Sequence, residues 1–193
     1  SVLKLTDRVT PYDLNSPLFS DYAFKLRTVW LPKGQAAQYV DEGSFDFPIG
    51  TILSKTFYYP TEIAGSHRVL QSDALPEYNL ATGLDVSKIT LVETRILVHR
   101  DAGWVALPYV WNAQQNEARL KRAGDIKRFE LMRKDSHESV TFSYLVPNVN
   151  QCAGCHAENA TTKVLRPIGP KARHLNKTVS FSGAPQNQLT AWK

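Results

Sequence analysis

Hydrophobic and polar residues alternate along much of this chain with the two-residue period of β-strands. The clearest pair of such segments reads as a hairpin, because only residues 100–103 separate its two arms. Pro108 in the second arm indicates an edge position or a bulge, since proline cannot donate a backbone hydrogen bond. The pattern predicts strands at residues 24–31, 89–99, 104–111, 127–133 and 139–146, and a β-rich segment at 45–59 with a Pro-Ile-Gly bend near its start.

Helical periodicity is weak by comparison. Residues 114–123 fit a short helix or a loop followed by a strand, and the pattern does not decide between the two. We therefore expect a mainly β protein: one domain, residues 1–193, with an antiparallel β-sheet core at about 20–146. A C-terminal segment, residues 147–193, is expected to carry short helices, because Pro167 and Pro170 interrupt regular structure there.

The C-terminal segment contains the sequence Cys152-Ala153-Gly154-Cys155-His156. The C-x-x-C-H pattern is the attachment site of a c-type haem. In this interpretation Cys152 and Cys155 form thioethers with one covalent haem c, and His156 is the proximal iron ligand. The spacing suits a helix that opens at about Cys152, because one turn presents both sulfurs along the same porphyrin edge.

Other interpretations of the two cysteines fit less well. A redox dithiol normally follows a strand in an alternating β/α pattern, which is missing here. A closed structural zinc site needs four ligands, and the chain has no second cysteine pair. A disulfide between Cys152 and Cys155 would be strained and would close almost no loop. The sequence therefore favours covalent haem.

Composition and charge restrict the possible partners. The formal charge is +5, and basic residues cluster at 119–122, 127–128, 133–134 and 171–177. Such clusters are either a solvated face or a docking surface for an acidic redox partner. No nucleic-acid module and no apolar run long enough for a membrane span is found in the sequence. Because haem c is attached outside the bacterial cytoplasm, we expect a periplasmic or secreted protein whose signal peptide has been removed.

Three further stretches of the sequence resemble a known family: residues 10–27, residues 146–151 just before the haem motif, and residues 167–176. Together they resemble a family of uncharacterised secreted bacterial mono-haem c-type proteins. Members of that family sometimes accompany or are fused to quinoprotein sugar dehydrogenases. The resemblance implies a redox partner such as a quinoprotein dehydrogenase, and it supplies no activity.

A second resemblance concerns layout. Residues 47–55, the hairpin reaching Trp104 and the late haem motif are similar to cytochrome c′-beta and to the hydroxylamine-oxidising cytochromes with a lysine cross-linked to haem. This likeness implies a sheet that packs on the haem and walls its distal pocket. The sequence does not identify Lys55 as a cross-linking lysine, and we expect an ordinary surface lysine there.

The group opposite His156 would decide the role of the haem. His174 and Met132 are the candidate sixth ligands, although a surface histidine and a core methionine are the simpler interpretations. His67, His99 and His137 are expected at the surface or in hydrogen bonds. An aromatic distal wall would come from Phe57, Tyr58, Tyr59, Trp104 or Trp111, although aromatic residues at strand spacing are usually core residues. Glu93, Arg95 and Glu130 are candidate acid–base groups that the sequence does not place in the pocket.

Three functions remain open from the sequence. We expect a mono-haem c-type cytochrome that mediates electron transfer, rather than an enzyme. The alternative is an open-site haem protein that binds NO or CO or oxidises small nitrogen compounds, as in cytochrome c′-beta-like proteins. A third interpretation is the haem module of a larger oxidoreductase, because residues 187–193 look like the start of a helix that continues past Lys193.

Overall fold

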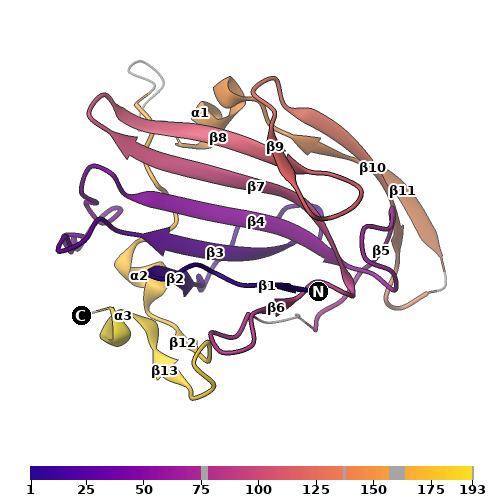
Figure 1. Cartoon of the computed structure of the whole chain (residues 1–193), viewed down its shortest axis with the longest axis horizontal. Helices are drawn as coiled ribbons and strands as arrows, with labels where there is room; N and C mark the ends of the chain where they lie inside the picture. The colour runs from indigo at the N-terminus through magenta and orange to yellow at the C-terminus, as the bar shows by residue number, and fades with distance from the viewer. Residues whose placement is uncertain (75–77, 137, 157–163, 193) are drawn as a thin grey trace.

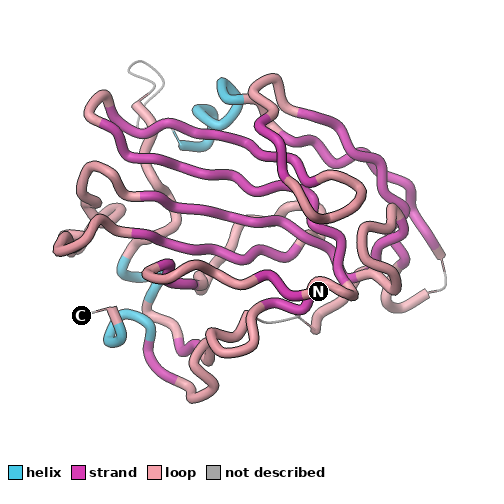
Figure 2. Tube along the Cα trace, viewed as in Figure 1, coloured by secondary structure: helices cyan, strands magenta, loops and turns pink. Residues whose placement is uncertain are grey.

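The computed structural model describes residues 1–74, 78–136, 138–156 and 164–192, and it confirms a mainly β fold with antiparallel sheets (Figures 1 and 2). The main sheet has six strands, all antiparallel to their neighbours. In spatial order these are β2 (Val9–Tyr12), β3 (Phe24–Trp30), β4 (Ile52–Pro60), β7 (Ile89–Arg100), β8 (Gly103–Trp111) and β9 (Ala118–Leu120).

Smaller elements surround the main sheet. A three-stranded sheet has the order β11 (Ser139–Val146), β10 (Asp125–Met132) and β5 (Arg68–Leu70), and only β5 pairs in parallel. Two further strand pairs and the helices complete the described part of the chain. They are β1 (Val2–Leu3) with β6 (Leu84–Asp85), β12 (Thr178–Val179) with β13 (Gln186–Asn187), α1 (Val149–His156), α2 (Ala172–Leu175) and α3 (Gln188–Ala191).

The predicted hairpin is confirmed as β7 and β8. At Pro108 the only strand partner of β8 in the described chain is β7, because β9 pairs only with residues 109–111. Residues 114–123 form a loop and then strand β9, not a helix. Lacking strong helical periodicity, this segment instead adds an edge strand to the sheet.

Two expected boundaries are wrong. The β-rich segment expected from residue 45 becomes a strand only at Ile52, because the bend expected at residues 48–50 is a turn in which the Thr51 N–H donates to the Pro48 carbonyl. The helix expected at about Cys152 begins three residues earlier, at Val149. In addition, β2 extends the sheet to residues before the expected start near residue 20.

One face of the main sheet is covered in two places. Over one end lies the β5–β10–β11 sheet, whose Phe129 and Tyr144 pack with Phe57 and Tyr59 of β4. Over the other end lie residues from the C-terminal segment, including the fully buried Leu175. In Figure 1 this segment runs across the sheet from the side of β8 down to α2 near β2. Neither the smaller sheet nor these residues of the C-terminal segment pack on the middle of this face.

The opposite face is closed by a third cluster. Leu26 of β3 and Tyr58 of β4 pack there against Leu84, Val86 and Ile89. Since side chains alternate between the faces of a strand, Tyr58 lies on this face while its neighbours Phe57 and Tyr59 lie on the other. The alternation thus separates the apolar core into two layers.

Candidate functional site

The C-x-x-C-H sequence lies in α1, the last five residues of which are Cys152 to His156. The helix begins with a reciprocal capping box: the Gln151 N–H donates to Asn148 Oδ1 at 2.8 Å, and the Asn148 N–H donates to Gln151 Oε1 at 2.9 Å. The side chains of Cys152, Cys155 and His156 lie outside the described part of the structure. The backbone therefore provides the helix that the motif requires.

A cavity of about 560 Å³ lies between the uncovered middle of the sheet and the start of α1. Its volume falls in the range of about 300–1,000 Å³ typical of cofactor and ligand sites. Gln151, the residue directly before Cys152, lines it together with Pro147. Strands β2, β3, β4, β7 and β8 supply one side of the lining, and residues 14–20, 167–170 and 174 supply the other.

Much of the cavity wall is apolar. Leu53 of β4 and Leu97 of β7 come from the sheet, and Leu14, Leu18 and Ile168 come from the two loops. Those loops are held in place by backbone contacts, because the Asn15 N–H donates to the His174 carbonyl at 2.9 Å and the Phe45 N–H donates to the Pro170 carbonyl at 3.0 Å. The cavity is thus built from segments that lie far apart in the sequence.

Four basic side chains line the same cavity: Lys25, Arg27, Lys55 and Arg95. Three of them form a row across the sheet, because Arg27 pairs with Lys55 and Lys55 pairs with Arg95 in adjacent strands. Lys25 lies on the same face, two residues before Arg27 on β3. The cavity therefore has an apolar periphery and a basic centre.

Arg27 is the most buried of the four, with 4% of its side chain exposed. Its Nη1 atom lies 3.0 Å from Asp13 Oδ1, and Lys177 Nζ donates to the other carboxylate oxygen of Asp13. The Arg27 Nε–H is buried and has no hydrogen-bond partner in the described structure. An unpaired buried donor of this kind costs free energy in the folded protein.

Arg95 is held by a second buried network. Its guanidinium donates two hydrogen bonds to the Glu93 carboxylate, at 2.6 and 2.9 Å, and the Tyr144 hydroxyl donates a third at 2.7 Å. Glu93 is fully buried. Glu93 and Tyr144 thus fix the guanidinium of Arg95 on the cavity side of the sheet.

The two lysines surround the ring of Phe57. Lys25 Nζ lies 5.8 Å and Lys55 Nζ 5.5 Å from the ring centroid, and the Arg95 guanidinium carbon lies 4.5 Å from it. Burial and then repulsion from neighbouring arginines lower the pKa of Lys25 and of Lys55 to about 8. The prediction that Lys55 is an ordinary surface lysine is therefore wrong, because its side chain lines the cavity.

Of the two candidate sixth ligands, only His174 lines the cavity. It is half-buried in α2, and burial together with Arg173 and Lys171 lowers the pKa of its imidazole. Met132 lies on β10, away from the cavity lining, and its Sδ accepts a hydrogen bond from Arg68 Nε at 3.2 Å. The structure thus brings His174, and not Met132, to this cavity.

The remaining candidates are spread over the molecule. His67 is exposed, and His99 bonds to the Phe47 carbonyl at 2.8 Å while stacking on Trp104. His137 lies outside the described residues. Of the five aromatic candidates only Phe57 lines the cavity. Tyr59 is in the core under the smaller sheet, and Trp104 packs near the C-terminal segment. Tyr58 and Trp111 lie on the opposite face of the main sheet. Glu93 and Arg95 adjoin the cavity, whereas Glu130 forms an exposed ion pair with Arg68.

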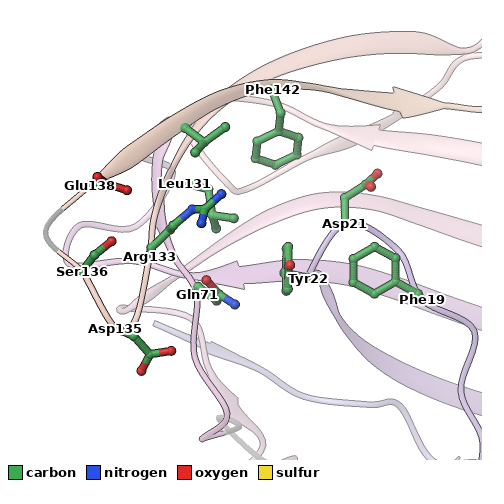
Figure 3. Close-up of a pocket in the computed structure, with 11 residues that line it drawn as sticks. Phe19, Asp21, Tyr22, Gln71, Leu131, Arg133, Asp135, Ser136, Glu138 and Phe142 are labelled. Atoms are coloured by element: carbon green, nitrogen blue, oxygen red, sulfur yellow. The ribbon is translucent and has the colours of Figure 1, made fainter.

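A second cavity of about 650 Å³ lies where β10 and β11 meet residues 19–22 (Figure 3). Leu131 and Phe142 form its apolar part, and Arg133, Asp135 and Glu138 surround it near the end of the hairpin. Phe19 lines both cavities, so the two cavities adjoin at this residue.

Comparison with protein-family models, with curated proteins and with solved structures found no match to this chain. Within the described ranges, no three His, Cys, Asp or Glu side chains gather as a metal site. In the same ranges no helix has the length and apolar character to cross a membrane.

The basic centre of the cavity is the feature that sequence reasoning missed. Its only local signal is the alternation of Lys25 and Arg27 with apolar residues on a predicted strand. Basic residues on the face that should enter the core are unusual, and that position would have been the indication of a binding site.

Proposed function

We propose that this protein is a mono-haem c-type cytochrome. Cys152 and Cys155 bind the haem through thioethers, His156 is the proximal ligand, and the cavity beside α1 receives the porphyrin. The observation that carries the proposal is that Gln151, directly before the C-x-x-C-H motif, lines a cavity of cofactor size.

The lining fits a haem. A porphyrin is a broad apolar ring with two carboxylate groups at one edge, and the cavity combines leucine side chains with four basic ones. The side chains of Lys25 and Lys55 are suited to such carboxylates. When bound, a haem supplies a one-electron redox couple, whose potential depends on the axial ligands and on burial.

We propose electron transfer as the role. Arg119, Lys121 and Arg122 form an exposed basic patch, and the Arg122 carbonyl accepts a hydrogen bond from the Val149 N–H at the start of α1. The patch is therefore next to the helix that carries the haem motif. An acidic redox partner, such as a quinoprotein dehydrogenase, would be steered to this position by its charge. Attachment of haem c implies a periplasmic or secreted location.

Small-ligand binding is the second candidate function. Among the described residues that line the cavity, His174 is the only histidine or methionine, and it comes from the C-terminal segment rather than from the sheet. If His174 does not ligate the iron, the sixth position is open to NO or CO.

The first experiment tests for the cofactor. The protein, produced in a bacterial host that attaches haem c in the periplasm, is denatured in alkaline pyridine and its haemochrome spectrum is recorded. We expect one haem per chain that remains after acid–acetone extraction, and none in Cys152→Ala/Cys155→Ala. A wild-type protein without covalent haem would refute the proposal.

The second experiment separates the two roles. Ferric and dithionite-reduced spectra are recorded before and after addition of CO and NO. Sharp α and β bands that do not respond to either gas support electron transfer, and His174→Ala should then give a high-spin spectrum while Met132→Leu does not. A high-spin wild-type spectrum that shifts with CO would instead support small-ligand binding.

A further inference from the structure

Among the described residues, the basic side chains that line the cavity outnumber the acidic side chains paired with them. Arg27 is paired with Asp13, which is also bound by Lys177, and Arg95 is paired with Glu93. In the described part of the chain, the Lys25 ammonium donates only to the backbone carbonyl of Leu18. Within the described structure, the Lys55 ammonium has no hydrogen bond or ion pair. Its one charged contact there is a cation–π contact with the ring of Phe57.

Such an arrangement costs free energy in the isolated protein. Lys25, Lys55 and Arg95 all lie within 6 Å of one phenyl ring, so their charges repel one another in a partly buried space. A fixed cluster of like charges is a common feature of sites that bind an ion of opposite sign. Glu93 and Tyr144 keep Arg95 in the cluster, and Asp13 keeps Arg27 beside it.

We propose that Lys25, Lys55 and Arg95, with Arg27 at their side, form a binding site for one oxyanion the size of a carboxylate. Two sources supply that chemistry: a propionate group of the haem, or a small free oxyanion that enters the cavity. The haem source rests on the proposed function, whereas the free source does not.

The test uses the purified wild-type protein with its cofactor, and Lys55→Gln. Acetate and inorganic phosphate are titrated by calorimetry at pH 7, and the haem propionate bands are followed by resonance Raman spectroscopy. Lys88→Gln is the control, because Lys88 is exposed and does not line the cavity. Lys25→Gln is a second variant in case Lys55→Gln does not fold, and Lys55→Arg should restore the wild-type result.

Two results would support the site and tell its sources apart. If a free oxyanion fills it, acetate or phosphate binds to the wild type, and Lys55→Gln weakens binding at least tenfold while Lys88→Gln changes it less than twofold. If a haem propionate fills it, neither ion binds, and the propionate bands shift in Lys55→Gln but not in Lys88→Gln.

Absence of both effects in both cavity variants would overturn the proposal, as would equal weakening in Lys55→Gln and Lys88→Gln. This result is distinct from failure of the proposed function. A protein that carries no haem refutes the cytochrome assignment through its haemochrome spectrum, while the acetate and phosphate titrations still decide whether the oxyanion site exists.

Discussion

Lys25 and Lys55 are the residues at which burial and charge conflict most directly. Burial is the main cause that lowers the pKa of each to about 8, and Arg27 and Arg95 lower it further by repulsion. Asp13 and Asp21 act in the opposite direction on Lys25, and Glu93 does so on Lys55. Both lysines therefore bind a proton less readily in the folded protein than in the unfolded chain.

This difference makes stability depend on pH. Between the folded pKa near 8 and the usual value of 10.5, the unfolded chain binds more protons, so the free energy of unfolding rises with pH. One lysine contributes at most about 1.4 kcal/mol per pH unit. We expect stability to increase from pH 8 to 9.5 in low salt without added anions, as measured by urea unfolding.

The variant Lys55→Met should show a smaller rise than the wild type over this interval. Buried tyrosines oppose this rise near the upper end of the interval, because burial raises the pKa of Tyr12 to about 12 and also raises that of Tyr59 and Tyr144, whereas the same side chains ionise near pH 10 in the unfolded chain. The wild type and the variant share this contribution, so the difference between them reports on Lys55. An identical pH dependence in the wild type and the variant would show that Lys55 keeps an ordinary pKa in the folded protein.

The sequence predicted individual residues only where local pattern is enough. Alternation places Lys25 and Arg27 on one face of β3. Whether they lie beside Lys55 and Arg95 depends on the register of strands β3, β4 and β7, which pairs Arg27 with Lys55 and Lys55 with Arg95. That register follows from long-range packing, and no nearby residue encodes it.

At the scale of elements, the connection between β11 and α1 depends on one glycine. Gly124 precedes β10 with a φ of +79°, and a Cβ there would lie 2.5 Å from the Val146 carbonyl oxygen and 3.0 Å from Asn148 N. These atoms belong to the segment that leads into the capping box of α1. A side chain at position 124 would therefore displace the start of the motif helix.

We expect Gly124→Ala to lower the free energy of unfolding by about 1–3 kcal/mol, through backbone strain and this close contact. The yield of covalently attached haem should fall as well. Gly103→Ala is the matched control, because Gly103 has a φ of +103° but nothing within 4 Å of the added Cβ. Urea unfolding and haemochrome spectra measure both effects, and equal losses in the two variants would contradict the role of the close contact.

The long strands could be predicted because their stretches rich in β-branched and aromatic residues are long and bounded by turn residues, as in β7 and β8. The short strands β5 and β6 were missed, and β9 was left undecided between a helix and a loop followed by a strand, since two or three residues carry no measurable period. They form because neighbouring strands offer unpaired backbone groups. Similarly, the start of α1 depends on the pair Asn148 and Gln151 rather than on the haem motif.

At the scale of the whole molecule, the cavity closes because the two ends of the chain meet. Gln188 is 1% exposed, and its side chain joins three backbone groups. Its Oε1 accepts from the Asp13 N–H at 2.8 Å, and its Nε2 donates to the carbonyls of Asp13 at 2.9 Å and Leu175 at 3.2 Å. Through these bonds the C-terminal segment is fixed beside Asp13, the partner of Arg27. The sequence gives no sign of a contact between residues 175 positions apart.

Gln188→Ala removes all three bonds and leaves the buried Asp13 N–H without its acceptor. We expect a loss of about 2–4 kcal/mol in the free energy of unfolding, because an unsatisfied buried donor and a new void both destabilise the folded state. The C-terminal segment should also open locally, so limited proteolysis within residues 177–192 should be faster than in the wild type.

Gln186→Ala is the control, because Gln186 is exposed and is expected to change stability by less than about 0.5 kcal/mol. A loss confined to global stability, with unchanged proteolysis of the C-terminal segment, would mean that this segment is held mainly by Leu175 and its apolar neighbours. Faster proteolysis in Gln188→Ala alone would show that one buried amide holds the C-terminal segment over the cavity. The same variant should then admit acetate, phosphate or CO to the cavity more rapidly than the wild type.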